Sequence, residues 1–176
     1  MIRKAVPADL DAVAAIYDEI HQAEETGALS VGWMRGVYPV RATAEAALKR
    51  NDLFVLIKDG VLSGSGVINN IQTADYAKAR WEHETPPERV CVLHTLTISP
   101  RAARMGLGRQ FVAFYEAYAR ETGCPELRID TNKRNLAARK LYRELGYKEI
   151  AVVPTIFNGI PDVDLVLLEK HLPPKA

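Results

Sequence analysis

The chain has little cysteine, little excess charge and no long hydrophobic run. Its two cysteines, Cys91 and Cys124, are too few for a disulfide framework and too far apart for a zinc site, which predicts reduced thiols. The formal charge is only +1, so no electrostatic feature favours nucleic acid or an anionic membrane as a partner. No segment approaches the ~20 apolar residues of a membrane span, and the first residues lack the apolar core of a signal peptide. These absences predict a cytoplasmic protein with no membrane or nucleic-acid partner.

Histidine is also scarce, and its distribution shows no metal-ligand spacing. The four histidines are His21, His83, His94 and His171. Short, regular intervals between ligands mark many metal sites in sequences, so the sequence predicts no bound metal.

Apolar residues, in contrast, make up 48% of the 176 residues, which is enough for one well-buried core. We expect a single domain over residues 1–176. The segment 72–89 lacks strand periodicity and contains Pro86-Pro87, which predicts a long loop between strands. Residues 173–176 form a short polar tail.

The spacing of apolar residues predicts alternating helices and strands. Helices are expected between residues 7 and 27, at about 43–49, from 109 to about 121 and at 136–145. Strands are expected at 2–5, 53–57, 61–71, 90–98, 127–130, 147–153 and 163–168. The Asp59-Gly60 pair predicts a hairpin between the second and third strands. Antiparallel runs on both sides of a strand–helix–strand unit indicate a mixed α/β sheet.

The most informative segment is the turn that joins the strand at 90–98 to the next helix. Gly106 and Gly108 let the main chain approach a ligand closely, and the helix begins with unpaired N–H groups, which favours an anion. Positive charge that would suit a pyrophosphate comes from Arg101, Arg104 and Arg109. The turn fits neither the P-loop nor the dinucleotide fingerprint, and two glycines there are also ordinary turn chemistry.

A second segment begins at Asn135, after the expected strand at 127–130. Together the two segments resemble the GCN5-related N-acetyltransferase (GNAT) superfamily. The family's first signature, a proline, a basic stretch and Gly-x-Gly opening a helix, is matched by Pro100, Gly106 and Gly108. Its second signature is matched by Asn135, Ala138, Leu141, Tyr142, Gly146 and Tyr147. The family's usual Arg or Gln at the start of the glycine turn is Ala103 here, and Arg104 is expected to substitute for it.

The resemblance, which extends from about residue 90 to residue 147, implies an α/β fold of the GNAT type. That fold has a mixed, mostly antiparallel central sheet of about six to seven strands, about four flanking helices and a diverging central strand pair. The resemblance also implies acetyl-coenzyme A as co-substrate, a small-molecule or peptide amine that attacks it directly in a ternary complex, and a homodimer. The residues expected to bind coenzyme A are Leu96, Thr97, Ile98, Arg104, Met105, Gly106, Leu107, Gly108, Arg109, Asn135 and Tyr142.

The resemblance also implies catalytic roles. Tyr142 occupies the position of the family's usual general acid, and we favour that role over the alternative of an aromatic residue that only packs in the core. His94 is the leading candidate for the base, with a structural strand histidine as the alternative reading. A main-chain N–H near Leu96, at a strand bulge, is the expected oxyanion donor. Asn135 has two expected roles, as a helix cap and as a ligand for coenzyme A. The rival bases are Glu24, Glu25 and Glu82.

The acceptor pocket is expected to contain Trp33, Arg35, Tyr38 and Trp81. These aromatic residues, with the nearby carboxylates Glu82 and Glu84, would suit a cationic or aromatic amine. Two other functions remain open. One is a module that senses acyl-coenzyme A without catalysis, and the other is transfer to an alcohol or of a longer acyl chain.

Overall fold

Seven strands form one mixed sheet in the order β1-β2-β3-β4-β5-β7-β6. The structure is a computed structural model that describes residues 1–173, so the last three residues of the expected polar tail lie outside the described residues. The strands are β1 (Ile2–Lys4), β2 (Leu53–Lys58), β3 (Val61–Asn69), β4 (Val90–Ile98), β5 (Glu126–Asn132), β6 (Lys148–Phe157) and β7 (Ile160–His171). The α-helices are α1 (Leu10–Glu25), α2 (Arg41–Lys49), α3 (Leu107–Glu121) and α4 (Leu136–Glu144).

The mostly antiparallel sheet with four helices confirms the predicted fold class. β4 has the predicted bounds, and Asp59 and Gly60 form the predicted hairpin between β2 and β3, both with positive φ, as a tight hairpin turn requires. The predicted strands at 147–153 and 163–168 are longer in the structure, because β6 and β7 pair as far as the turn at Asn158-Gly159. No helix within residues 1–173 has the length and apolarity needed to cross a membrane.

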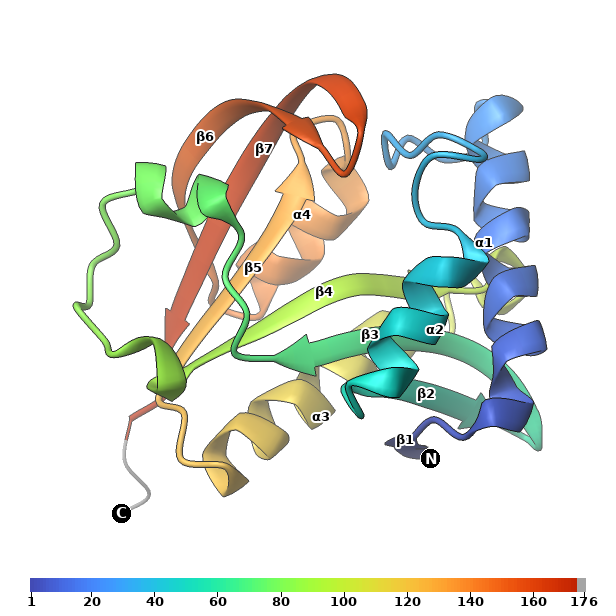
Figure 1. The fold of residues 1–176 in the computed structure, drawn as a ribbon, viewed down its shortest axis with the longest axis horizontal. Helices are drawn as coiled ribbons and strands as arrows, with labels where there is room; N and C mark the ends of the chain where they lie inside the picture. The colour runs from blue at the N-terminus through green and yellow to red at the C-terminus, as the bar shows by residue number, and fades with distance from the viewer. Residues whose placement is uncertain (174–176) are drawn as a thin grey trace.

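Helices cover both faces of the sheet, with α3 and α4 on one face and α1 and α2 on the other (Figure 1). The apolar residues of α3 recur at helical spacing and are buried against β4 and β5. The long segment 70–89 contains only short 3-10 turns, at Ala74–Lys78 and Pro87–Arg89. Its Tyr76 packs against Val90 and Leu165, so this segment covers the part of the sheet that α1 and α2 leave open.

The two central strands are paired at one end and separate at the other. β4 and β5, which pair in parallel, are in register from Val90–Glu126 to Leu93–Ile129. Beyond that point β4 remains paired with β3, and β5 remains paired with β7 (Figure 1). The buried hydroxyl of Tyr115 in α3 donates hydrogen bonds to the carbonyl oxygens of Cys91 in β4, at 2.6 Å, and of Arg128 in β5, at 3.2 Å. It therefore joins the two strands at their paired end.

Replacing Tyr115 by phenylalanine is expected to lower the free energy of unfolding by about 1–3 kcal/mol, because two buried carbonyl groups lose a donor. Tyr118→Phe, one turn later in α3, is the matched control, since the Tyr118 hydroxyl makes no hydrogen bond within residues 1–173. It should change stability by less than about 0.5 kcal/mol. Urea unfolding followed by circular dichroism measures both values. Equal losses would mean that the Tyr115 hydroxyl does not hold the strands together.

Candidate active site

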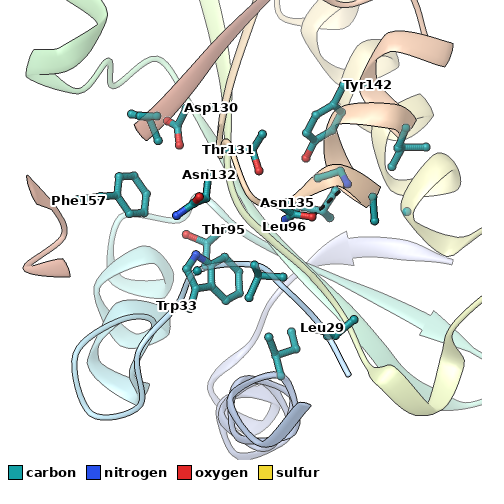
Figure 2. Close-up of a pocket in the computed structure, with 18 of the residues that line it drawn as sticks. Leu29, Trp33, Thr95, Leu96, Asp130, Thr131, Asn132, Asn135, Tyr142 and Phe157 are labelled. Carbon is teal, nitrogen blue, oxygen red and sulfur yellow. Dashed lines mark hydrogen bonds between the residues drawn. The ribbon is translucent and has the colours of Figure 1, made fainter. Parts of the chain in front are cut away.

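A cavity of about 280 Å³ lies where β4 and β5 separate (Figure 2). It is lined by both strands, by α4, and by the loop that follows α1. The site residues expected from the sequence that line it are Trp33, Tyr38, Leu96, Ile98, Gly108, Asn135 and Tyr142. The structure thus brings the two sequence signatures together on one cavity, and adds lining residues from the N-terminal part, such as Ile20 and Leu29.

The β4 backbone is irregular at the cavity. Ser65 is in register with Thr97 but Val67 is in register with His94, so Thr95 and Leu96 form a bulge opposite Gly66. Thr95 has a positive φ of 49°, and its side chain is hydrogen-bonded to the Tyr38 hydroxyl. A bulge at this place is what the resemblance implies for the oxyanion donor.

The glycine turn presents main-chain N–H groups without helical partners next to this cavity. Gly106 has a φ of 72°, and the first hydrogen bond of α3 runs from Gln110 N to Gly106 O, so the N–H groups of residues 107–109 have no helical partner. Gly108 faces α4, where a Cβ atom would lie 3.2 Å from Leu141 Cδ2. A residue larger than glycine at position 108 would occupy space between α3 and α4.

Two of the three arginines expected at the turn are paired with carboxylates. Arg101 binds Glu19, and Arg109 binds Glu144 at 2.6 Å. Arg104 is exposed and makes no ion pair within residues 1–173. It is therefore the arginine that the fold leaves available, at the position expected to substitute for Ala103.

Tyr142 lies on α4, and Asn135 immediately precedes the first residue of that helix. Tyr142 is 5% exposed, and burial raises the pKa of its phenol. Its hydroxyl points into the cavity and makes no hydrogen bond within residues 1–173 (Figure 2). Asn135 is the N-cap of α4, because its side chain accepts a hydrogen bond from Ala138 N at 3.1 Å. Its predicted role as a cap is confirmed, and its amide group also lines the cavity.

His94 faces a second cavity of about 250 Å³, on the other side of β4. Its Nε2 lies 3.0 Å from Asn69 Oδ1, which also accepts a hydrogen bond from Ile71 N. Since the amide nitrogen of Asn69 donates to Asp52, the oxygen must face His94, and Nε2 is the donor. Burial lowers the pKa of His94 to about 4, so the ring is neutral at pH 7.

The two cavities are neighbours, because four residues line both. These residues are Tyr38, Thr95, Asp130 and Phe157. Because the first cavity extends toward the glycine turn through Gly108 and the second opens between β3, β4 and residues 70–73, two molecules could approach the same point from different sides. This arrangement suits a reaction between two bound substrates.

Asp130 is the site residue that sequence reasoning missed. It follows Ile129, the last residue of β5 that pairs with β4, and burial raises the pKa of its carboxyl group to about 6. The Tyr76 hydroxyl donates a hydrogen bond to Asp130 Oδ2 at 2.8 Å. The signal in the sequence was an acidic residue that directly follows the apolar end of a central strand, where a carboxylate is costly to bury.

Some expected residues lie elsewhere. Arg35 is exposed and bound by Glu25 at 2.8 Å and Asp18 at 3.2 Å, and it lines neither of these cavities. Trp81 packs on Arg128, whose Cζ atom lies 4.0 Å from the centroid of the Trp81 ring. Trp81 also lines neither of the two cavities. The Thr97 side chain is turned away, toward Ser65, at 2.7 Å.

The rival bases also have structural partners. Glu24 accepts hydrogen bonds from the backbone N–H groups of Val31, at 2.6 Å, and of Gly32, at 3.2 Å, and so shapes the loop after α1. Glu25 binds Arg35, and Glu82 binds Lys148. None of the three lines either cavity.

Comparison with known proteins places the chain among acetyltransferases. A family model described as "Acetyltransferase (GNAT) family" matches residues 13–147. A curated relative from Stenotrophomonas maltophilia, named aminoglycoside N(6')-acetyltransferase type 1, is 28% identical over 82 residues. That match covers 44% of this chain and 54% of the relative, so the chain spans about half the length of this relative.

Solved structures share the fold over nearly the whole chain. A GNAT-family acetyltransferase from Streptococcus agalactiae superposes with a TM-score of 0.81 at 22% identity, covering 99% of this chain and 96% of the other. The yncA protein of Salmonella typhimurium, solved with its cofactor acetyl-CoA, gives a TM-score of 0.71 at 19% identity, with coverages of 100% and 95%. At these identities the likeness is one of fold.

Asp130→Asn is expected to stabilise the protein at neutral pH. The folded pKa of Asp130, about 6, lies above its ordinary pKa of 3.8 in an unfolded chain, so the stability associated with its protonated form is complete below pH 4 and lost as the pH rises through 6. The variant should match the wild type near pH 4 and exceed it by roughly 1–3 kcal/mol at pH 8.

Urea unfolding at several pH values measures this difference. Asp18→Asn, which changes an exposed carboxylate of α1, is the control and should show no such pH-dependent gain. A variant of Asp130 that is less stable than the wild type at pH 8 would contradict a partly buried carboxyl group whose ionised form is disfavoured in the folded protein.

Proposed function

The chain belongs to the acetyltransferase (GNAT) family, and we propose that it transfers an acetyl group from acetyl-coenzyme A to an amine within a ternary complex. The observation that supports this most directly is the presence of two neighbouring cavities that share Thr95 of the β4 bulge as a lining residue. One cavity connects to a helix N-terminus suited to phosphate, and the other ends at an ionisable carboxyl group.

The residues of the first cavity fit acetyl-coenzyme A. The N–H groups of residues 107–109 and the free charge of Arg104 suit its pyrophosphate. Beyond Leu93, β4 has no partner in β5, so the backbone of residues 96–98 borders the cavity and suits the amides of a pantetheine arm. When bound there, acetyl-coenzyme A supplies the thioester whose carbonyl carbon is attacked.

Two groups of the chain would assist the reaction from this cavity. The main-chain N–H of the bulge at Leu96 donates a hydrogen bond to the oxygen on which negative charge develops. The Tyr142 hydroxyl donates its proton to the departing thiolate. Burial raises the pKa of Tyr142, which keeps the phenol protonated, as an acid must be before the step.

We assign the proton acceptor to Asp130 rather than to His94. With its pKa lowered to about 4, His94 is neutral but only weakly basic at pH 7. The carboxyl group of Asp130, with a pKa of about 6, is mostly ionised at pH 7, and Asp130 lines both cavities. His94, fixed by Asn69, lines the wall of the second cavity and positions the acceptor there.

The acceptor would enter the second cavity. The rings of Tyr38 and Phe157 are in edge contact, with centroids 5.4 Å apart. They line this cavity together with the carboxylate of Asp130, and such a combination suits a protonated amine before it reacts. Either a small molecule or a peptide N-terminus fits this chemistry. The partial match to an aminoglycoside acetyltransferase adds aminoglycosides to the amines to be tested.

A panel of amines with acetyl-coenzyme A tests the proposed function through thiol release. The panel includes a peptide N-terminus, a polyamine, an aminoglycoside and an arylalkylamine. At least one amine should accelerate release, and Tyr142→Phe should lower kcat by about 10²-fold or more while the Kd for coenzyme A, measured by calorimetry, stays within about twofold. Tight coenzyme A binding without release for any amine would instead support an acyl-coenzyme A sensor. Unchanged turnover in Tyr142→Phe would remove its assignment as the acid.

The pH profile distinguishes the two candidate bases. In the wild type, kcat/KM should rise with pH through about 6 as Asp130 ionises. Asp130→Asn should lose this limb and about 10²–10⁴-fold in kcat/KM, whereas His94→Gln should keep the limb and mainly raise the KM for the amine. The opposite result, a limb that survives in Asp130→Asn and disappears in His94→Gln, would assign the base to His94.

A further inference from the structure

Two histidines and a buried glutamate meet at the end of the sheet remote from the active site. Glu126 is the first residue of β5 and His171 the last of β7, and the two are in register. His83 comes from the long segment 70–89. The three side chains are far apart in the sequence, which is why spacing along the chain predicted no metal site.

The donor atoms of these side chains converge. Glu126 Oε2 lies 3.0 Å from His171 Nδ1 and 3.6 Å from His83 Nδ1, and one donor atom from each residue falls within 4.8 Å of the others. In a tetrahedral zinc site with bonds of about 2.0–2.1 Å, ligand atoms are about 3.3 Å apart. The glutamate distances therefore already bracket the required spacing.

The two imidazole rings have the freedom to complete the geometry. They are stacked, with centroids 4.5 Å apart and planes inclined by 22°. Binding one ion requires the rings to tilt further so that both Nδ1 lone pairs converge. The side chains of His83 and His171 are 46% and 41% exposed, so they can rotate, whereas the carboxylate is held in place by burial.

The glutamate lacks a full set of partners. Glu126 is 0% exposed, and its Oε1 has no hydrogen-bond partner within residues 1–173. Such a buried, unpaired carboxylate oxygen is costly and is normally satisfied by a donor or an ion. The histidine nitrogens lie near the other oxygen, Oε2, so an ion held by both carboxylate oxygens would satisfy Oε1 as well.

A second buried carboxylate makes the surroundings more negative. Glu169 on β7 is 3% exposed, and its oxygens accept hydrogen bonds from the backbone N–H groups of Glu82, at 2.9 Å, and His83, at 3.4 Å. The neighbouring cation Arg128 donates instead to Gln72 Oε1, at 2.5 Å, and to His83 O, at 3.3 Å, and lies over Trp81. Lys148 pairs with Glu82. Neither Arg128 nor Lys148 therefore makes a hydrogen bond to Glu126 or Glu169 within residues 1–173.

We propose that His83, Glu126 and His171 bind one divalent transition-metal ion, with Zn²⁺ as the ion that fits two imidazole nitrogens and a carboxylate oxygen. A water molecule completes the tetrahedron. The ion links the segment 70–89 to the ends of β5 and β7, and thereby stabilises the fold.

Zinc binding to the tag-free full-length chain tests the proposal. Competition with a chromophoric chelator should give one equivalent of Zn²⁺ bound with micromolar or tighter affinity, and Zn²⁺ should raise the melting temperature reversibly with EDTA. His83→Gln and His171→Gln should each weaken binding at least ~10-fold. Glu84→Gln, an exposed carboxylate beside His83, is the matched control and should bind as the wild type does.

Absence of binding, or binding that both histidine variants retain, would overturn the proposal. Chemical labelling of the unsubstituted chain adds a measurement that does not depend on the folding of any variant. Zn²⁺ should protect His83 and His171 from diethyl pyrocarbonate while leaving labelling of His94 unchanged. If Zn²⁺ left the labelling of His83 and His171 unchanged as well, that result would also overturn the proposal. None of these readouts involves acetyl transfer, so they are independent of the proposed function.

Discussion

The separation of β4 from β5 is the constraint on which the rest of the molecule depends. The two strands pair only as far as Leu93 and Ile129, after which each follows its other neighbour. Backbone groups that face the resulting gap have lost their partners within the sheet, and such groups need water or a ligand. An amide-bearing ligand can take the place of the missing strand. The packing of α3 and the hydroxyl of Tyr115 hold the paired end closed, so the opening stays at one place.

The same opening brings a carboxyl group to a position where it weakens the fold. Asp130 is the first residue of β5 beyond the paired stretch, and its raised pKa of about 6 records the free energy needed to ionise it there. The hydrogen bond from Tyr76 offsets part of this penalty and fixes the orientation of the carboxylate. Groups that destabilise a fold but have a pKa near neutrality are typical of active sites, which supports a catalytic rather than a sensing role.

The sequence predicted those features that local patterns determine. The bounds of β4, the hairpin at Asp59-Gly60 and the cap at Asn135 each depend on a few neighbouring residues, and all agree with the structure. Contacts between distant segments were not predictable in this way. The orientation of Asp130, the proposed base, depends on Tyr76, 54 residues away, and Arg35 is bound outside the pocket by two carboxylates of α1. No single sequence pattern identifies such partners.

The segment 70–89 covers part of the sheet in place of a helix. It covers the face of β4, β5 and β7 that α1 and α2 leave open, yet few of its residues are buried. Its first half is fixed by the bond from Tyr76 to Asp130, and its second half by Glu169, which binds two of its backbone N–H groups. With so little apolar burial, the position of the segment depends mainly on these polar contacts. An ion at the proposed metal site would strengthen the second attachment. It would thereby help to fix the segment that carries Tyr76, the hydrogen-bond partner of the proposed base Asp130.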